Sequence, residues 1–404
     1  MAADRVIIAG GGIGGLSAAL ALAGNGFKVA VLEKSPALGE IGAGIQLGPN
    51  AFHCFDRLGL AEKAREHAVF IDALRLMDSI TAEKIAEIPL GDAFRARFGN
   101  PYAVVHRGEL HKIMLRTCQA HADIELHVDS EVIDFEQHPD GVEAVLRSGE
   151  HVRGAALIGA DGLWSNIRRK LVGDGAPRVS GHSTYRSVIP LDRMPESLRW
   201  NAATLWAGPK HHVVHYPLSG WKSFNLVVTF HNAAPAPVAG MPVPVEEVRA
   251  GFARAHPTVR EIIACGSDWK LWVLCDRDPV ERWVDGRVAL LGDAAHPMLQ
   301  YFAQGACMAM EDAVVLGETL RARSDDLPQA LSDYNVRRLL RTARVQLQSR
   351  EIGTHIYHPE GAHARLRNDL MANKSAEDWY DALQWLYGGF PSAATGQKVG
   401  QTDV

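Results

Sequence analysis

The chain begins with an apolar pattern that predicts a strand, a helix and a second strand. Arg5 to Ala9 is a short β-branched run, which is typical of a buried parallel strand. Apolar residues then recur at helical spacing from Ile13 to Ala23, and Asn25-Gly26 is a helix stop signal. Lys28 to Leu32 is the second apolar run. This part of the chain therefore has the pattern of an α/β protein.

Alternating apolar and polar positions predict β-structure through the middle of the chain. Residues 70–100 alternate like two strands of an antiparallel sheet. From about Thr184 to Asp276 strands dominate, which indicates a β-rich unit inserted into the α/β protein. Four runs between these regions alternate like a small meander: Ile124 to His127, Glu131 to Glu136, Val142 to Leu146 and His151 to Ile158.

The last third of the chain returns to a buried strand followed by helices. Val288 to Leu291 is an apolar run that ends on Gly292-Asp293, and Pro297 closes the loop after it. Helical periodicity follows from Gly305 to about Leu320 and again from Ala330 to Leu347. A strand that ends on an acid before a helix N-terminus suits a ligand with hydroxyl groups and an electron-rich end. Apolar side chains near the C-terminus either cap the core or form a homodimer contact: Trp379, Leu383, Trp385, Leu386 and Tyr387.

Composition and charge narrow the class of protein. The chain has 404 residues, 47% hydrophobic and 22% charged, which is typical of a globular protein with two or three structural units. Its net charge of −5 argues against nucleic acid as a partner, because phosphate binding needs a basic surface. The five cysteines form no C-x-x-C pair, as expected for reduced thiols in a cytoplasmic protein. No run of about 18 apolar residues and no signal-like N-terminus is visible, so we expect neither a membrane span nor a secretion signal.

A glycine-rich turn links the first strand to its helix. Gly10, Gly12 and Gly15 have the G-x-G-x-x-G spacing, and Glu33 follows the second strand, 18 residues after Gly15. The first glycine makes the turn, the second lets the backbone approach a pyrophosphate, and the third lets the helix pack on the strand. The acid can accept hydrogen bonds from a ribose. The motif alone is often only a loop, but its strands, helix and acid are all present and together predict a dinucleotide site.

Three further stretches each have a functional and a purely structural interpretation. Gly39 to Asn50 is either a surface loop or a lid over the flat part of a cofactor, and its apolar residues Ile41, Ile45 and Leu47 favour the lid; Asn50 is expected to cap the next helix. Arg107, just before a helix, is either a pyrophosphate clamp or a solvated side chain. Asp161-Gly162, followed by Ser165 as the cap of a helix that carries Arg168, is either a ligand-binding turn or an ordinary β-turn.

The three strand-end motifs resemble those of the single-component FAD-dependent aromatic hydroxylases, the p-hydroxybenzoate hydroxylase family. The resemblance covers nearly the whole chain and implies an α/β fold with a discontinuous Rossmann-like FAD-binding domain (1–72, 103–180 and 277–325). It also implies an inserted β-rich substrate domain (73–102 and 181–276) and a C-terminal helical segment (326–404). By resemblance, Glu33 binds the adenosine ribose of FAD, Arg107 the pyrophosphate and Asp293 the ribityl chain. The implied cofactor-binding set is Gly10, Gly12, Ile13, Gly15, Glu33, Lys34, Gln46, Arg107, Asp161, Asp293, Pro297, Gly305 and Ala306.

The helix that follows Asp293 departs from the common family pattern. The family often has G-x-G-x-N at its start, whereas this chain has Ala303-Gln304-Gly305-Ala306-Cys307. The helix N-terminus is still expected to face the flavin and to stabilise its reduced, anionic form. The segment His296 to Tyr301, together with His212 and Tyr216, looks most like the 3-hydroxybenzoate 6-hydroxylases within the family.

The histidine-rich run His211 to Pro217 is predicted to be a strand, so alternate side chains share a face. His212, Val214 and Tyr216 then face one way and His211 and His215 the other, so the histidines do not converge and we expect no metal site. The structural alternative is a surface histidine above a packed tyrosine. By resemblance His212, helped by Gln300, assists deprotonation of a phenol, and Tyr216 and Tyr102 orient the substrate.

The reaction that the resemblance implies is para-hydroxylation of 3-hydroxybenzoate, a small aromatic acid, to 2,5-dihydroxybenzoate (gentisate). The family uses FAD, O2 and a flavin C4a-hydroperoxide, whose electrophilic oxygen attacks an electron-rich ring. No second complete G-x-G-x-x-G unit exists, and the resemblance implies that the coenzyme binds only transiently and is NADH rather than NADPH. Salicylate or a hydroxynicotinate as substrate, and a non-catalytic flavin-binding protein, remain as alternatives.

Overall fold

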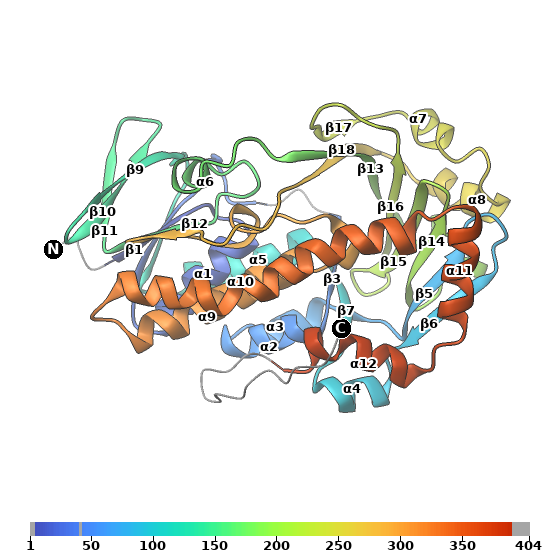
Figure 1. The fold of residues 1–404 in the computed structure, drawn as a ribbon, viewed down its shortest axis with the longest axis horizontal. Helices are drawn as coiled ribbons and strands as arrows, with labels where there is room; N and C mark the ends of the chain where they lie inside the picture. The colour runs from blue at the N-terminus through green and yellow to red at the C-terminus, as the bar shows by residue number, and fades with distance from the viewer. Residues whose placement is uncertain (1–4, 40–42, 390–404) are drawn as a thin grey trace.

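Two sheets of different type lie side by side along the long axis of the molecule (Figure 1). The computed structural model describes residues 5–39 and 43–389 of the chain. Its helices, in chain order, are α1 (Ile13–Gly24), α2 (Pro49–Arg57), α3 (Ala61–His67), α4 (Asp92–Phe98), α5 (Arg107–Gln119), α6 (Asn166–Leu171), α7 (Val245–Ala250), α8 (Pro257–Cys265), α9 (Gly305–Ala322), α10 (Leu327–Ile352), α11 (Gly361–Ala372) and α12 (Ala376–Tyr387).

The first sheet is mainly parallel and carries the glycine-rich turn. In spatial order its strands are β19 (Val284–Asp285), β20 (Val288–Leu290), β12 (Ala156–Gly159), β1 (Arg5–Ala9), β2 (Lys28–Leu32) and β8 (Ile124–His127). These strands are short and apolar because helices and a second layer of strands cover them, as is usual for parallel sheets. Helices α1, α5 and α9 pack together beside it, and a three-stranded antiparallel sheet contacts β1 and β12. The strands of that smaller sheet are β9 (Val132–His138), β10 (Gly141–Leu146) and β11 (His151–Gly154).

The first and the last of the four runs predicted to form a meander belong to the parallel sheet instead. Ile124–His127 pairs in parallel with β2, and Ala156–Gly159 lies between β1 and β20 in the parallel sheet. Only β9, β10 and β11 form an antiparallel unit. Alternation within a short run does not reveal the partner strand, because the same apolar residues fit either sheet.

The second sheet has eight strands and forms the other half of the molecule. In spatial order they are β17 (Ala239–Pro242), β18 (Lys270–Asp276), β13 (Arg178–Pro190), β16 (Ser223–His231), β15 (His211–Leu218), β14 (Ala202–Gly208), β5 (Ala73–Asp78) and β6 (Lys84–Pro89). The sheet thus joins strands from residues 73–89 to strands from residues 178–276. This agrees with the predicted β-rich unit, which was expected to combine these two parts of the chain. The α/β fold class with a β-rich insertion is confirmed, whereas the domain boundaries stay a prediction.

A small fourth sheet connects the two halves. It consists of β3 (Gly44–Leu47), β7 (Ala103–His106) and β4 (Val69–Phe70). The glycine-rich segment 39–50 was expected to be a loop, but its second part is the strand β3, paired antiparallel with β7. Residues 40–42, including Ile41 of the predicted lid, lie outside the described residues. The predicted cap at Asn50 is also wrong: Gly48 is the N-cap of α2, and the buried Asn50 amide donates to Gln304 and Glu311 instead.

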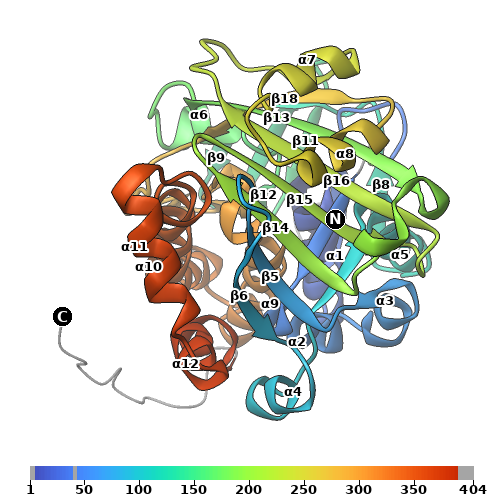
Figure 2. The same ribbon diagram turned by 90° about the vertical axis from the view of Figure 1, so that its right-hand side faces the viewer.

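The C-terminal helices run from the parallel sheet to the eight-stranded sheet. Helix α10 spans both halves, and α11 and α12 follow it beside β6 (Figures 1 and 2). A π-helical turn, Gly353–Tyr357, links α10 to α11. Leu386 and Tyr387 on α12 are buried, and the Tyr387 ring packs on Phe94 and Phe98 of α4, so this part of the aromatic tail caps the core. Helix α4 was not predicted, and residues 390–404 lie outside the described part of the chain.

Candidate active site

A cavity of about 340 Å3 lies between the glycine-rich turn of the parallel sheet and one face of the eight-stranded sheet. The residues that line it come from sequence positions between 12 and 357, so only the folded chain brings them together. The predicted site residues that line this cavity are Gly12, Ile13, Gln46, Arg107, His212, Tyr216, Asp293, Gln300, Gly305 and Ala306.

The glycines of the β1–α1 turn form a cradle with no room for side chains. Gly10 has a φ of +108°, and a Cβ there would lie 2.4 Å from the carbonyl oxygen of Ala160. A Cβ at Gly15 would lie 1.9 Å from the carbonyl oxygen of Gly10. Gly12 is the N-cap of α1 and lines the cavity. A backbone this closely packed at a helix N-terminus fits a pyrophosphate, so FAD fits this end of the cavity.

Glu33 joins the end of β2 to this turn. Its carboxylate accepts hydrogen bonds from the Gly11 amide at 2.7 Å and from the Ser35 amide at 2.9 Å. Burial acts to raise the pKa of Glu33, but the two amide hydrogen bonds outweigh it and lower that pKa. The ionised carboxylate keeps lone pairs for a ribose hydroxyl. The neighbouring Lys34 is exposed and does not line the cavity.

Two arginines contribute positive charge to the cavity wall. Arg107 is the first residue of α5, and its amide donates to Ala43 O at 3.1 Å. Arg186 on β13 was not predicted; its Nη2 donates to Gln300 Oε1 at 2.8 Å. Its Nε is buried without a hydrogen-bond partner among the described residues. Arg186 is therefore suited to bind an anionic group in the cavity.

Asp293 stands on a tight turn at the end of β20. Gly292 has a φ of +61°, and the exposed Asp293 lines the cavity. The turn is held from behind, because Asp312 on α9 accepts hydrogen bonds from the Gly292 amide at 3.0 Å and from His296 Nε2 at 2.5 Å. Pro297 is buried and does not line the cavity, so its predicted cofactor contact remains a prediction.

The N-terminus of α9 faces the same cavity. Gly305 and Ala306 line it, as do Ala303 and Gln304 just before the helix. Ala303 has a φ of +52°, in the region that favours glycine, at the position where the family pattern departs. The helix dipole places partial positive charge at this end of the cavity, which suits an electron-rich or anionic ring.

The Asp161 side chain caps a helix. Asp161 Oδ2 accepts from the Asn166 amide at 2.8 Å, and Ser165 accepts from the Arg168 amide at 2.8 Å, as predicted for this serine. Burial raises the pKa of Asp161. The neighbouring Ala160 and Gly162, rather than Asp161, line the cavity. Asp161 therefore shapes this wall through the backbone around it.

Arg168 was predicted only as a residue of the capped helix, yet it holds the turn beside Asp293. It is fully buried, and its Nη1 donates to the carbonyl oxygens of Ala294 and Ala295 at 3.0 and 2.5 Å. The same guanidinium forms an ion pair with Asp174. These bonds connect α6 to the loop that follows β20.

The predicted alternation of the histidine-rich strand is confirmed. His212, Val214 and Tyr216 of β15 line the cavity. His211 lies on the opposite face, where its Nε2 is 2.8 Å from Ser79 Oγ, and His215 stacks with Trp206. The two faces of this strand therefore have separate roles.

His212 and Gln300 reach the cavity with different supporting partners. His212 Nδ1 lies 2.8 Å from His358 Nε2, on the residue that follows the π-helical turn. Burial lowers the pKa of His212 well below its usual value, and His358 lowers it further. Gln300 Nε2 donates to the hydroxyls of Thr184 and Thr229 at 3.3 and 3.2 Å. His212 is thus uncharged at neutral pH, and Gln300 is oriented by the sheet face beside it.

The two predicted tyrosines lie in different places. Tyr216 packs over Gly44, where a Cβ would lie 2.5 Å from the tyrosine ring. Tyr102 lines an adjoining cavity of about 510 Å3, and its hydroxyl donates to Gln46 Oε1 at 2.7 Å. The wall shared by the two cavities consists of Gln46, Val214, Ala303 and Tyr357. Tyr102 can therefore act on the first cavity through Gln46, and its predicted substrate contact remains a prediction.

Several residues of this site were not predicted from the sequence. Arg186 could have been found from the alternation of β13, because residues two positions apart in a strand share a face and Arg186 lies two positions after Thr184. Tyr357 and His358 could not be found, because a π-helical turn has no clear sequence signature. Both residues contact His212 of β15 only through tertiary packing. In the sequence, the buried Asp312 is only one polar position within an apolar helical pattern, and that pattern does not indicate its role.

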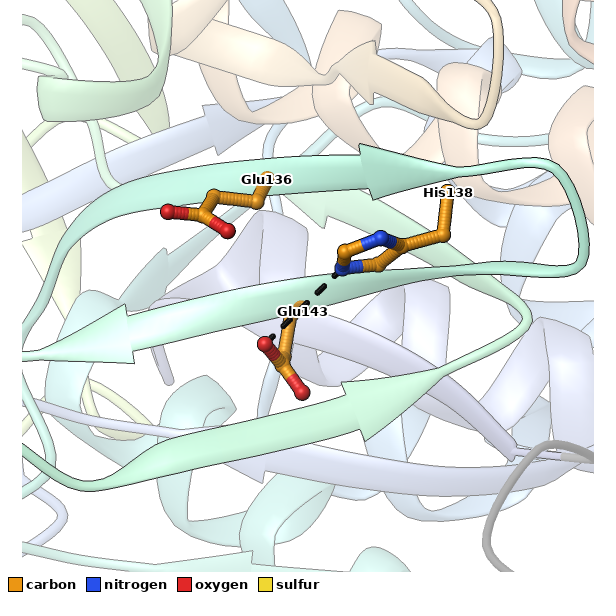
Figure 3. Close-up of side chains that lie close together, drawn as sticks. All are labelled: Glu136, His138 and Glu143. Carbon is orange, nitrogen blue, oxygen red and sulfur yellow. Dashed lines mark ion pairs between the residues drawn. The ribbon is translucent and has the colours of Figure 1, made fainter.

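One group in the described part of the chain brings metal-ligating atoms close together. Glu136, His138 and Glu143 lie on neighbouring strands of the small antiparallel sheet, and their side chains approach one another on one face of the hairpin (Figure 3). Glu143 is 3.8 Å from His138 Nε2 and 3.3 Å from His151 Nδ1. Surface acids with histidine partners are common without a metal, so we assign this group no site.

Among the described helices, none combines the length and the apolar character needed to cross a membrane.

Comparison with known proteins gives consistent matches over most of the chain. Residues 4–349 match the family described as FAD binding domain. The chain is 54% identical over 385 residues to 3-hydroxybenzoate 6-hydroxylase 1 of Aquipseudomonas alcaligenes, covering 95% of this chain and 98% of that protein. It is 50% identical over 383 residues to 3-hydroxybenzoate 6-hydroxylase of Polaromonas naphthalenivorans, covering 95% of each. The crystal structure of Klebsiella pneumoniae HpxO with FAD and uric acid is similar at 27% identity and a TM-score of 0.84, covering 97% of this chain and 98% of that one.

Proposed function

This chain belongs to the FAD-dependent aromatic hydroxylases, and we propose that it hydroxylates 3-hydroxybenzoate using FAD, O2 and NADH. The family resemblance predicted from the three strand-end motifs is confirmed by the FAD-binding-domain match and by the hydroxylase relatives. The observation that carries the substrate proposal is the shared cavity: His212 and Tyr216 face the same space as Asp293 and the start of α9.

The residues present fit FAD at one end of this cavity. Glu33 and the Gly10–Gly15 cradle would hold the adenosine ribose and pyrophosphate, with Arg107 beside them. Asp293 would accept from the ribityl hydroxyls, and the α9 N-terminus would face the electron-rich end of the flavin. When bound and reduced, the flavin supplies one oxygen atom of O2 in electrophilic form.

The residues on the sheet face bind and activate the aromatic acid. Arg186 is proposed to bind the carboxylate, because its guanidinium faces the cavity with Nε lacking a hydrogen-bond partner among the described residues. His212 accepts the phenol proton, which makes the ring electron-rich, and the bond to His358 at Nδ1 leaves Nε2 as the nitrogen for this task. Carbon 6 lies para to the hydroxyl on carbon 3, so hydroxylation there gives 2,5-dihydroxybenzoate.

The coenzyme is proposed to be NADH, bound only while it reduces the flavin. The chain has one complete G-x-G-x-x-G unit, and that unit is assigned to FAD. Comparing NADH and NADPH oxidation under the same conditions tests this preference.

Product analysis with a panel of aromatic acids tests the proposed function. Purified protein should carry FAD, and 3-hydroxybenzoate should stimulate NADH oxidation with gentisate formed in equal amount. Salicylate and 6-hydroxynicotinate serve as competing substrates, because relatives in this family differ in the ring that they hydroxylate. Stimulated NADH oxidation that yields only hydrogen peroxide would exclude 3-hydroxybenzoate as the substrate. Protein without FAD after reconstitution would exclude the flavin chemistry.

A further inference from the structure

His212 is hydrogen-bonded on its far side to a second histidine from the C-terminal helical segment. His212 Nδ1 and His358 Nε2 are 2.8 Å apart, and the two rings are stacked with centroids 5.0 Å apart. His358 follows the π-helical turn Gly353–Tyr357. Gly353 lets this turn pack closely on Tyr301, since a Cβ there would lie 2.6 Å from the Tyr301 ring. Local π-helical geometry often marks a functional position.

Two neutral imidazoles joined in this way form a chain along which a proton can move. One of the two bonded nitrogens donates and the other accepts. Because a neutral imidazole has one N–H donor and one acceptor nitrogen, the second nitrogen of the donating ring accepts and the second nitrogen of the accepting ring donates. For His212 the second nitrogen is Nε2, on a ring that lines the cavity. For His358 it is Nδ1, which makes no hydrogen bond within the described residues, and the ring is only partly buried. The pair thus leads from the cavity toward water.

The surroundings of His358 do not retain a positive charge. Burial, together with the neighbouring histidines, lowers the pKa of His358 to about 3. Burial likewise lowers the pKa of His182 to about 4. A proton that reaches this group therefore leaves it at neutral pH. The titratable groups that face His358 are His182 on β13, His212 on β15, His231 on β16, Tyr301 and Tyr357. His211, on the opposite face of β15, also contributes to lowering the pKa of His358.

We propose that His358 is a positioning residue that relays the phenol proton from His212 to solvent. The phenol O–H bond breaks as an N–H bond forms at His212 Nε2. The Nδ1–H bond of His212 breaks as an N–H bond forms at His358 Nε2, and the proton on His358 Nδ1 passes to water. No electrons change hands in these steps. This inference rests on the proposed function, because it requires a phenol in the cavity.

The variants His358→Gln and His358→Leu test the relay. Glutamine can keep a hydrogen bond to His212 but cannot pass a proton on, whereas leucine removes both. His363→Gln is the matched control, because His363 is exposed on α11 and outside the cavity. FAD content, thermal melting, KM and kcat for 3-hydroxybenzoate are measured for each variant between about pH 6 and pH 9, with and without added imidazole.

In His358→Gln we expect normal FAD content, a KM close to wild type, and a kcat at pH 7 lower by about 10²-fold, the range for lost proton transfer. Added imidazole or higher pH should restore much of this kcat. A kcat in His358→Gln equal to that of wild type would overturn the relay, and so would a reduced kcat that neither imidazole nor higher pH restores. Wild-type protein that forms no hydroxylated product would refute the proposed function itself, which separates the two failures.

Discussion

Asp312 and His296 form a buried hydrogen bond of 2.5 Å directly behind the Gly292-Asp293 turn. The same Asp312 oxygen accepts from the Gly292 amide, and the other oxygen accepts from Arg338 Nε at 2.6 Å. A single carboxylate on α9 thus ties the end of β20 to α10. The exposed Asp293 therefore stands on a turn that is held by the buried side chains of Asp312, His296 and Arg338, none of which lines the cavity.

The first prediction concerns the strength of this support. Asp312→Asn should destabilise the holoenzyme by about 3 kcal/mol, because it leaves the buried Arg338 charge with one acidic partner fewer. The shift of the denaturant midpoint measures this loss. Asp381→Asn is the control, since Asp381 is 69% exposed and its pair with Arg97 should contribute about 1 kcal/mol or less. Equal shifts in the two variants would show that the buried network does not support the turn.

The second prediction is a pH dependence of the same contact. Burial acts to raise the pKa of Asp312, but His296 and Arg338 outweigh it and lower that pKa to about 2, from a usual 3.8. Because the pKa of Asp312 is lower in the folded state than in the unfolded state, its ionised form stabilises the fold at pH values above the unfolded-state pKa. This stability is lost as the pH falls toward about 2. The stability difference between wild type and Asp312→Asn should therefore be constant above about pH 5 and shrink below about pH 4. A difference that stays constant down to pH 2.5 would contradict this assignment.

The third prediction concerns the close packing of Tyr216 on β3. In Gly44→Ala the new Cβ would lie 2.5 Å from the Tyr216 ring and 2.8 Å from its hydroxyl, so the ring must move. We expect the KM for 3-hydroxybenzoate to rise about tenfold, equivalent to about 1.4 kcal/mol. Gly39→Ala is the control, because a Cβ at Gly39 meets no atom of the described residues within 4 Å. An unchanged KM in Gly44→Ala would remove Tyr216 from substrate orientation.

The fourth prediction concerns the proposed ribityl contact. Asp293→Ala should weaken FAD binding by about tenfold or more, because a hydrogen bond to a charged group contributes about 1.5–3 kcal/mol. Titration of the apoprotein with FAD measures the affinity. Asp325→Ala, an exposed acid between α9 and α10, should bind FAD like wild type. Full flavin affinity in Asp293→Ala would refute the role of this carboxylate.

The fifth prediction separates binding from chemistry at β15. His212→Ala should keep FAD and 3-hydroxybenzoate binding but slow product formation by about 10²-fold or more, because the phenol loses its base. His211→Gln is the control from the opposite face of the same strand, where the side chain contacts Ser79. Product formation coupled to NADH oxidation is the measurement. Unchanged coupled turnover in His212→Ala would exclude His212 from the mechanism.

The sequence by itself determined the family and the local elements that carry its motifs. The β1–α1–β2 unit, the alternation of β15 and the start of α9 follow from the spacing of neighbouring residues, since backbone hydrogen bonds and side-chain direction within an element are local. The glycines at positions 10, 12 and 15 with Glu33, and Gly292 with Asp293, could be recognised because each motif is contiguous or lies within one supersecondary unit.

Only the tertiary structure decided which of these elements meet. It placed Ile124–His127 in the parallel sheet, made Gly44–Leu47 a strand and turned Asn50 toward α9, all against the sequence-based expectation. It also set His358 against His212, 146 positions earlier in the chain. Such pairings depend on how the packed faces of distant elements fit together, and no local periodicity encodes that fit.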